Sequence, residues 1–406
     1  MLSLRVENEE WGTMNVEILT ELDRILTEPL SSVLERERSA FDRLLADSGN
    51  RVVLFGAGNL GRKALACLRS IDVEPLAFAD NGETRWGAQV DGVPVLSPKE
   101  AAERYGASAL FVVTIWSLGH FYPETRAKLE KLGCGRVEPV APLRWKFADR
   151  LLPDYCNNLP HKLYEQAPDV HRAASIWADE FSRKEYLNQV KWRALGDLNA
   201  LGPPVSEKQY FLDSLYQIQE NEIFIDCGAY IGDTAEVLVS RYPDFSRIVA
   251  IEADPQNFER LTKWIAMLDV PLSSKIHALK AAVSSARGEL HFQASGDEAA
   301  RLAAGGDVVV ECVSLDDLLA DDGPTFIKMD IEGAELDALA GARRTIQTHR
   351  PILAVCVYHK QDDLWRVPLF VRSMDDDYRF YLRPHEADGK ELVCYAVPEY
   401  RLKRAA

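Results

Sequence analysis

Residues 223–232 read Ile223-Phe224-Ile225-Asp226-Cys227-Gly228-Ala229-Tyr230-Ile231-Gly232. An apolar run that passes straight into a glycine-rich turn predicts a β-strand leading into a helix, with the glycines allowing a ligand to approach the backbone. A second copy of the pattern lies upstream, at Leu54-Phe55-Gly56-Ala57-Gly58-Asn59-Leu60-Gly61. An acid stands 24 positions after the first glycine of each copy, Asp80 in one and Glu252 in the other. Because such an acid can accept hydrogen bonds from ribose hydroxyls, the pattern predicts two nucleotide-cradling units in series.

Outside these turns, short apolar runs alternate with stretches of helical periodicity. Strands are expected at residues 51–55, 75–78 and 109–113, and again at 223–225, 248–251, 276–279, 325–329 and 352–357. Helices are expected between them, for example at 60–69, 98–104, 124–132, 234–240 and 257–268. Two β-rich runs, 289–293 and 308–313, predict a hairpin-like excursion, and Asp388-Gly389 predicts a hairpin between 378–382 and 391–397. The fold class is therefore α/β, with a doubly wound parallel sheet that an antiparallel hairpin closes.

Four consecutive segments follow from this pattern. Residues 1–50 form a helical N-terminal segment, 51–141 a small Rossmann-like domain, 142–210 a helical connector, and 211–406 the second α/β unit. The leucines at helical spacing in the first segment predict packing helices or, alternatively, the contact of a homodimer. The aromatic residues of the connector predict helix packing or, alternatively, the lining of a substrate entrance.

Composition narrows the class of protein. The 406 residues include 47 Lys and Arg against 63 Asp and Glu, a net charge of −16 that disfavours nucleic acid and anionic membranes as partners. Seven cysteines without a CxxC pair suit a reducing, cytoplasmic setting. The N-terminus is too acidic for a signal peptide, and no apolar stretch approaches the roughly 20 residues of a membrane helix. We therefore expect a soluble protein.

Polar residues follow four of the predicted strands of the second unit, and ligands collect at that edge of a parallel sheet. They are Asp226, Glu252, Asp254, Asp330, Glu332, His359 and Lys360. Glu252 is expected to clasp ribose hydroxyls, while Asp226 and Asp233 meet the charged amino-acid end of a ligand. The alternatives are a turn-forming role for Asp226 and an exposed strand end for Glu252.

Three carboxylates, Asp330, Glu332 and Glu335, surround the turn after the predicted strand at 325–329. For Glu335 a stabilising position at a helix N-terminus is an equal alternative. The ligand spacing is not diagnostic of any cation, so no metal is expected. His359 has an unperturbed pKa of about 6.5, which suits a general base, although a structural histidine is the alternative.

These residues resemble the FkbM family of S-adenosylmethionine-dependent methyltransferases. The resemblance spans about residues 210–398 and lies in five pieces: 223–234, Ile251-Glu252-Ala253-Asp254-Pro255, 327–335 with its D-x-E-G-x-E pattern, 357–365 and 378–383. It implies a class I methyltransferase fold and methyl transfer to a hydroxyl of a sugar or polyketide-like acceptor, with S-adenosylhomocysteine as product. The segment 384–389 departs from the family's pattern.

The resemblance also implies roles for individual residues. The cofactor would be held by Asp226, Gly228, Ala229, Tyr230, Gly232, Asp233, Thr234, Glu252, Ala253 and Asp254, with Ala281 and Ala282 beside the adenine. In the expected mechanism His359 removes the proton of the acceptor, Asp330 orients the histidine or the acceptor, and Glu332 completes the catalytic group.

The first unit has the context of a nucleotide site, formed by Gly56, Gly58, Asn59, Leu60, Gly61 and Asp80. It resembles small Rossmann-like domains found ahead of sugar-modifying enzymes, which implies a nucleotide or nucleotide-sugar ligand. The alternative is a module that only packs or dimerises. Two competing functions are an NAD-dependent oxidoreductase and a non-catalytic nucleotide-sensing protein. Asp226 disfavours the oxidoreductase because a carboxylate there would face a pyrophosphate.

Overall fold

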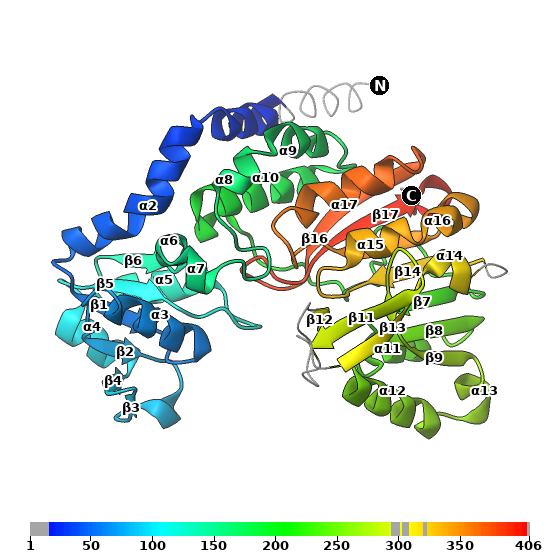
Figure 1. The fold of residues 1–406 in the computed structure, drawn as a ribbon, viewed down its shortest axis with the longest axis horizontal. Coiled ribbons are helices and arrows are strands. Elements are labelled where there is room, and N and C mark those ends of the chain that lie inside the picture. Colours follow the sequence, from blue (N-terminus) through cyan, green and yellow to red (C-terminus); the bar gives the residue numbers. More distant parts are fainter. Residues whose placement is uncertain (1–15, 294–300, 303–307, 320–322, 404–406) are drawn as a thin grey trace. The chain divides into compact units, whose positions relative to one another are not determined.

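The computed structural model describes residues 16–293, 301–302, 308–319 and 323–403. It divides into two compact units (Figure 1). Unit 1 comprises residues 1–174, 184–204 and 386–390, and unit 2 comprises 175–183, 205–385 and 391–406. This division differs from the four consecutive segments predicted from the sequence, because each unit is built from separate stretches of the chain.

Unit 1 contains a six-stranded sheet in the order β3-β4-β2-β1-β5-β6. The strands are β1 (Val52–Phe55), β2 (Ala77–Ala79), β3 (Gln89–Val90), β4 (Val93–Leu96), β5 (Leu110–Val113) and β6 (Val137–Pro139). All pairings are parallel except that of β3 with β4. Helices α3 (Asn59–Arg69), α4 (Pro98–Tyr105) and α5 (Tyr122–Lys131) lie between the strands in sequence, and η1 (Glu83–Arg85) follows β2. The predicted strands at 51–55, 75–78 and 109–113 are confirmed, with bounds that differ by one or two residues.

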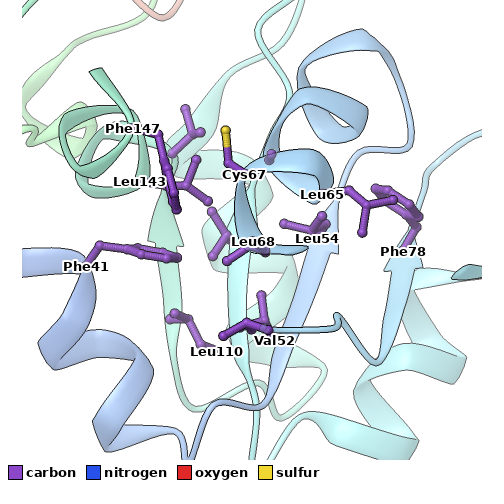
Figure 2. Packing of buried hydrophobic residues seen from close by; sticks show 14 of the residues in the cluster. Phe41, Val52, Leu54, Leu65, Cys67, Leu68, Phe78, Leu110, Leu143 and Phe147 are labelled. Atoms are coloured by element: carbon purple, nitrogen blue, oxygen red, sulfur yellow. The ribbon is translucent and has the colours of Figure 1, made fainter. Parts of the chain in front are cut away.

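The remaining helices of unit 1 come from the N-terminal segment and the connector. They are residues 16–26, α2 (Leu30–Asp47), α6 (Ala141–Lys146), α7 (Ala148–Leu151), α8 (His161–Tyr164), α9 (Ala167–Ala174), the main part of α10 (Glu180–Leu195) and η2 (Leu198–Ala200). Phe41 of α2 and Phe147 of the connector belong to the same buried cluster as Leu54 and Leu110 of the sheet (Figure 2). Glu37 of α2 lies 2.9 Å from the ring of His161 on α8. The first segment and most of the connector are therefore parts of unit 1.

Unit 2 is built on a seven-stranded sheet in the order β16-β17-β15-β14-β7-β8-β9. The strands are β7 (Ile223–Cys227), β8 (Arg247–Glu252), β9 (Ile276–Lys280), β14 (Phe326–Met329), β15 (Ile352–Cys356), β16 (Tyr378–Pro384) and β17 (Leu392–Pro398). The first five pair in parallel, and β17 pairs antiparallel with β15 and β16. The predicted parallel sheet and its closing hairpin are confirmed.

Helices connect these strands, and several begin just after a strand ends. They are α11 (Asp233–Arg241), α12 (Pro255–Met267), α13 (Val270–Ser273), α14 (Leu315–Leu318), α15 (Glu335–Ala340), α16 (Arg343–His349), α17 (Asp363–Arg372) and η3 (Glu399–Arg401). A second, four-stranded sheet comprises β10 (Ala282–Val283), β11 (Gly288–Gln293), β12 (Arg301–Leu302) and β13 (Val308–Val313). The antiparallel pairing of β11 with β13 is the predicted excursion. None of the helices in the described part of the chain has the length and apolarity needed to cross a membrane.

The strand order of unit 2 fixes where a ligand can enter. β7 has β8 on one side and β14 on the other, so the direction of winding reverses between β7 and β14. In an open α/β sheet this reversal separates the loops and leaves a crevice at the carboxyl ends of the strands. The loops that follow β7 and β14 meet closely there, because a Cβ on Gly228 would lie 1.9 Å from the carbonyl oxygen of Asp330.

Candidate active site

The loop after β7 has a conformation that requires glycine. Gly228 and Gly232 have φ angles of 79° and 94°, in the left-handed region where a side chain is strained. A Cβ on Gly232 would also lie 2.6 Å from the ring of Trp264. Tyr230, between the two glycines, has a φ angle of 49°. The turn predicted at residues 228–232 is therefore tight, and it leads directly into α11.

Asp226 on β7 is completely buried and forms an ion pair of 3.0 Å with Lys328. The two residues are register partners on the neighbouring strands β7 and β14. Lys328 Nζ also donates a hydrogen bond of 2.6 Å to the carbonyl oxygen of Gly228. Burial raises the pKa of Asp226 to about 6 although Lys328 opposes the shift. The carboxylate is thus directed to a lysine inside the sheet, and its predicted contact with a ligand stays a prediction.

Glu252, the last residue of β8, holds the glycine turn in place. Its Oε2 accepts a hydrogen bond of 2.8 Å from the backbone of Tyr230, and its Oε1 accepts one of 2.7 Å from the backbone of Asp254. Burial raises the pKa of Glu252 to about 7, against the lowering effect of these two bonds. Each carboxylate oxygen keeps a second lone pair, so the side chain can still accept hydrogen bonds from a ligand.

The other residues expected at the cofactor have mixed surroundings. Asp254 caps α12, because its Oδ1 accepts hydrogen bonds from the backbone of Gln256 and Asn257. Ala281 is buried, and its backbone N–H donates to the carbonyl oxygen of Glu252 over 3.2 Å. The remaining members lie on or beside the same turns: Ala229 is buried, Asp233 and Thr234 begin α11, Ala253 follows β8, and Ala282 begins β10.

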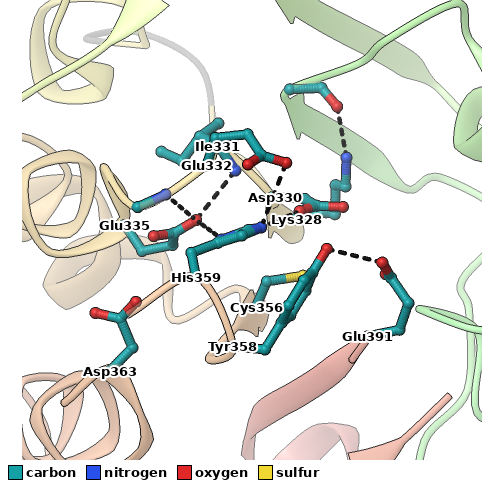
Figure 3. A network of polar contacts seen from close by, with 12 residues as sticks. Lys328, Asp330, Ile331, Glu332, Glu335, Cys356, Tyr358, His359, Asp363 and Glu391 are labelled. Carbon is teal, nitrogen blue, oxygen red and sulfur yellow. Dashed lines mark hydrogen bonds and ion pairs between the residues drawn. The ribbon is translucent and has the colours of Figure 1, made fainter. Parts of the chain in front are cut away.

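A dense polar network lies beyond the ends of β14 and β15 (Figure 3). His359 is at its centre, with Nδ1 2.7 Å from Glu335 and Nε2 3.3 Å from Asp330 and 3.6 Å from Glu332. Asp330, Glu332 and His359, the three residues predicted to be catalytic, are therefore brought together.

A histidine that acts as a general base must be neutral, whereas the surroundings of His359 favour its positively charged form. Burial alone would lower its pKa, but the carboxylates of Glu335, Glu332 and Asp330 outweigh burial and raise the pKa to about 10. The ring is therefore an imidazolium at neutral pH and has no lone pair with which to accept a proton. The expectation that His359 removes the acceptor's proton conflicts with this environment, because the sequence does not show that three carboxylates surround one ring.

Glu332 has the pKa and the partial exposure that suit a general base. Burial raises its pKa to about 7, and the neighbouring Asp330 and Glu335 add to the shift while His359 opposes it. The side chain is 14% exposed. The residue also has a φ angle of 55°, an uncommon conformation for a non-glycine residue that tends to be retained at functional sites. Asp330 differs: burial alone would raise its pKa, but Lys328 and His359 outweigh burial and lower it.

Sequence reasoning assigned no role to five residues of this network, Gln209, Tyr210, Cys356, Tyr358 and Glu391. Tyr210 donates a hydrogen bond of 2.8 Å to Asp330 Oδ2, and its hydroxyl lies 3.4 Å from the sulfur of Cys356. Glu391 accepts hydrogen bonds of 2.7 Å from the hydroxyl of Tyr358 and from the amide of Gln209. Glu391 could have been found, because a strand that enters the sheet antiparallel starts at the edge where the parallel strands end. Tyr210 and Gln209 lie in the segment interpreted as connector and carry no such signal.

Asp330, Cys356 and Glu391 are the group in the described residues that could hold a metal ion, each with one ligand atom within 4.8 Å of the others. Burial and the nearby Asp330 and Glu391 raise the pKa of the Cys356 thiol well above 9. The expectation that the site uses no metal stays a prediction.

The glycine turn of unit 1 is also tight, since a Cβ on Gly61 would lie 2.0 Å from the carbonyl oxygen of Gly56. Asp80, expected to contact a ribose, accepts hydrogen bonds from the backbone of Ala57 and Gly82, both over 2.8 Å. It also forms an ion pair of 2.9 Å with Arg85. These contacts stabilise the turn itself. A nucleotide at Gly56, Gly58, Asn59, Leu60 and Gly61 stays a prediction.

Comparison with known proteins places these features in a family. The model of the methyltransferase FkbM domain matches residues 226–388. The crystal structure of methyltransferase FkbM from Methylobacillus flagellatus KT is similar with a TM-score of 0.72 and 23% identity. That match covers 94% of this chain and 99% of the other, and it shows a shared fold.

Among curated proteins, the hexuronic acid methyltransferase AglP of Haloferax volcanii is 24% identical over 140 residues. The match covers 33% of this chain and 55% of AglP, so the chain spans about half the length of that relative. Residues 226–388 therefore form a methyltransferase FkbM domain.

Proposed function

We propose that unit 2 transfers a methyl group from S-adenosylmethionine to a hydroxyl group of a saccharide, free or linked to a nucleotide or polyketide. The observation that carries the proposal is the excess of carboxylates at the reversal point of the sheet. Asp226, Glu252, Asp330, Glu332, Glu335 and Glu391 gather there against two buried cations, Lys328 and His359. A sulfonium cation is stabilised by such surroundings, whereas a pyrophosphate is repelled. The saccharide acceptor is inferred from the relative named a hexuronic acid methyltransferase.

The residues of the turn suit this cofactor in shape and chemistry. Gly228 and Gly232 leave the backbone open to close approach, and the free lone pairs of Glu252 can accept hydrogen bonds from two ribose hydroxyls. In this proposal Asp233 and Thr234, at the start of α11, bind the polar end of the cofactor, and the buried Ala281 and Ala282 lie beside its adenine. When bound, the cofactor supplies an electrophilic methyl group.

The acid network prepares the acceptor. Glu332, with a pKa of about 7, takes the proton of the acceptor hydroxyl as its oxygen attacks, because a base whose pKa is near the working pH is the most effective. Asp330 stays ionised and accepts a hydrogen bond that orients the acceptor. His359 is a positioning residue, since its imidazolium holds Asp330 and Glu332 on one side and Glu335 on the other.

Isothermal titration with S-adenosylmethionine, S-adenosylhomocysteine and NAD, followed by transfer of a labelled methyl group to a panel of saccharides, tests the proposal. Glu332→Gln should abolish transfer while the affinity for S-adenosylhomocysteine is kept. Asp337→Asn removes an exposed carboxylate from α15 and is the matched control. A heat of binding with NAD, and none with S-adenosylmethionine or S-adenosylhomocysteine, would refute the proposed function in favour of an oxidoreductase.

A further inference from the structure

One half of the active-site edge carries acceptor groups for hydrogen bonds and a surplus of negative charge. This half, the acid edge, consists of Asp330 and Glu332 in the loop after β14 and of Glu391 immediately before β17. Their side chains are partly exposed, 24% for Asp330 and 14% for Glu332. Oxygens of Asp330 and Glu391 lie within 4.8 Å of each other. A molecule that binds beside β14 therefore meets three carboxylates, two from the loop after β14 and one from the start of β17.

The cations nearby neutralise only part of the acid edge. His359 Nε2 lies 3.3 Å from Asp330 and 3.6 Å from Glu332, so one imidazolium faces both carboxylates. Lys328 points to Asp226 and to the carbonyl oxygen of Gly228. The proton on His359 Nδ1 is directed to Glu335, a fourth carboxylate, whose Oε2 has no hydrogen-bond partner among the described residues.

Two further groups on neighbouring elements do not change this balance. Lys360 donates through Nζ to the carbonyl oxygen of Gly333. Asp363 has a pKa of about 8, raised by burial and by Glu335, and is neutral near pH 7. The acid edge therefore keeps a net negative charge.

The hydrogen-bonding pattern leads to the same conclusion. An ionised carboxylate only accepts hydrogen bonds, and the neighbouring donors are already used: Tyr210 donates to Asp330, and Gln209 and Tyr358 donate to Glu391. A ligand at this edge must therefore supply the donors. Sugar hydroxyls and ammonium groups do so, whereas a ligand carboxylate would meet like charge and would have to give up its hydration without compensation.

We infer that the acceptor carries no carboxylate on the ring that is methylated, so that the enzyme acts on uncharged or amino-substituted sugars and discriminates against uronates. The inference rests on the proposed function and narrows its substrate class. It also separates this chain from what the name of its relative AglP states.

The test uses the full chain, labelled S-adenosylmethionine and matched p-nitrophenyl glycosides of glucose, galactose and mannose, of their uronic acids, and of glucosamine. Transfer to at least one neutral or amino member should be at least tenfold faster than to its uronate. The assay is run once with EDTA and once with added Mg²⁺. Transfer to a uronate that equals or exceeds transfer to its neutral counterpart, under either condition, would overturn the inference. Absence of transfer to every member would overturn it too. Cofactor binding, measured on the same preparation, then decides whether the proposed function fails as well.

Two variants tie the discrimination to the acid edge. Glu391→Gln keeps the shape of the side chain and removes one charge, so transfer to the uronates relative to the neutral sugars should rise severalfold. The affinity for S-adenosylhomocysteine should not change. Asp337→Asn is the control, because it removes an equal charge from the exposed face of α15. If Glu391→Gln does not fold, binding of the uronates and neutral sugars to Glu332→Gln, measured by titration, gives the same comparison. An unchanged ratio in both variants refutes the role of the acid edge.

Discussion

Replacing Glu252 by glutamine tests how the chain holds its cofactor. The substitution keeps the shape of the side chain but removes its charge. A hydrogen bond to a charged group contributes about 1.5–3 kcal/mol, so losing the charged acceptor for a ribose hydroxyl should raise the Kd about 10- to 150-fold. The new amide also faces the backbone N–H of Tyr230 or Asp254, which both donate to Glu252. One of these donors loses its partner, at about 1–3 kcal/mol of stability.

The affinity should also depend on pH. Because the pKa of Glu252 is about 7, the ionised form that accepts ribose hydroxyls is lost as the pH falls through that value. The affinity of the natural protein should then fall by up to about tenfold per pH unit below about pH 7. The variant has no such group, so the ratio of the two Kd values approaches a constant at high pH and shrinks at low pH. Taking the ratio cancels the titration of Asp226 and Glu332, which both variants share.

Isothermal titration with S-adenosylhomocysteine from about pH 5.5 to about pH 8.5 measures this ratio. Glu259→Gln, an exposed residue of α12, is the control and should follow the natural protein at every pH. The reasoning is refuted if Glu252→Gln binds as tightly as the natural protein, or if the ratio does not change with pH.

Three further outcomes follow from the buried charges and the glycine turn. The folded-state pKa of His359 is raised from 6.5 to about 10. The stabilising effect of its charge is therefore complete below about pH 6.5 and is lost as the pH rises through about 10. The unfolding temperature should fall more steeply between pH 7 and 10 for the natural protein than for His359→Gln. Lys328→Met leaves Asp226 buried without its cation and should destabilise unit 2 by about 3–5 kcal/mol, and adding Asp226→Asn should restore much of the loss. Hydrogen exchange in β7 and β14 measures the stability of the single and the double variant. Equal protection in the two variants would contradict the pairing. Gly228→Ala places a methyl group against a backbone carbonyl 1.9 Å away and should abolish binding of S-adenosylhomocysteine in titrations, while Gly288→Ala, which meets nothing within 4 Å, should bind normally.

Local patterns in the sequence were sufficient for most of the sheet. Apolar runs located β1, β7, β8, β14 and β15, because a strand buried on both faces needs little information beyond its own residues. The dipeptide Asp388-Gly389 located the hairpin of β16 and β17 because both residues tolerate the positive φ angles of a tight turn, here 56° and 77°. The strand order and the separate four-stranded sheet required pairings between distant segments, which periodicity does not contain.

The candidate site was predictable as a set of positions but not as a set of charges. Asp330, Glu332 and His359 could be placed at one edge because each follows a strand. The protonation of His359 depends on carboxylates from other segments that meet it only in the folded chain. The pairing of Lys328 with Asp226 had one usable signal, a lysine inside the otherwise apolar run Phe326–Met329, since a charge in a buried strand must find a partner.

The loop of residues 386–390 limits how this protein can be cut into pieces. The loop connects two strands of unit 2, yet it is part of unit 1. Its residue Asp388 is 1% exposed and contacts His120 over 2.6 Å and the backbone of Tyr122 over 2.9 Å. A fragment that starts at residue 205 would carry this carboxylate without its donors, and a fragment that ends at residue 204 would leave those donors unpaired. Crystallisation or domain-exchange experiments should therefore keep the polypeptide intact, or replace the loop with a short turn before separating its halves.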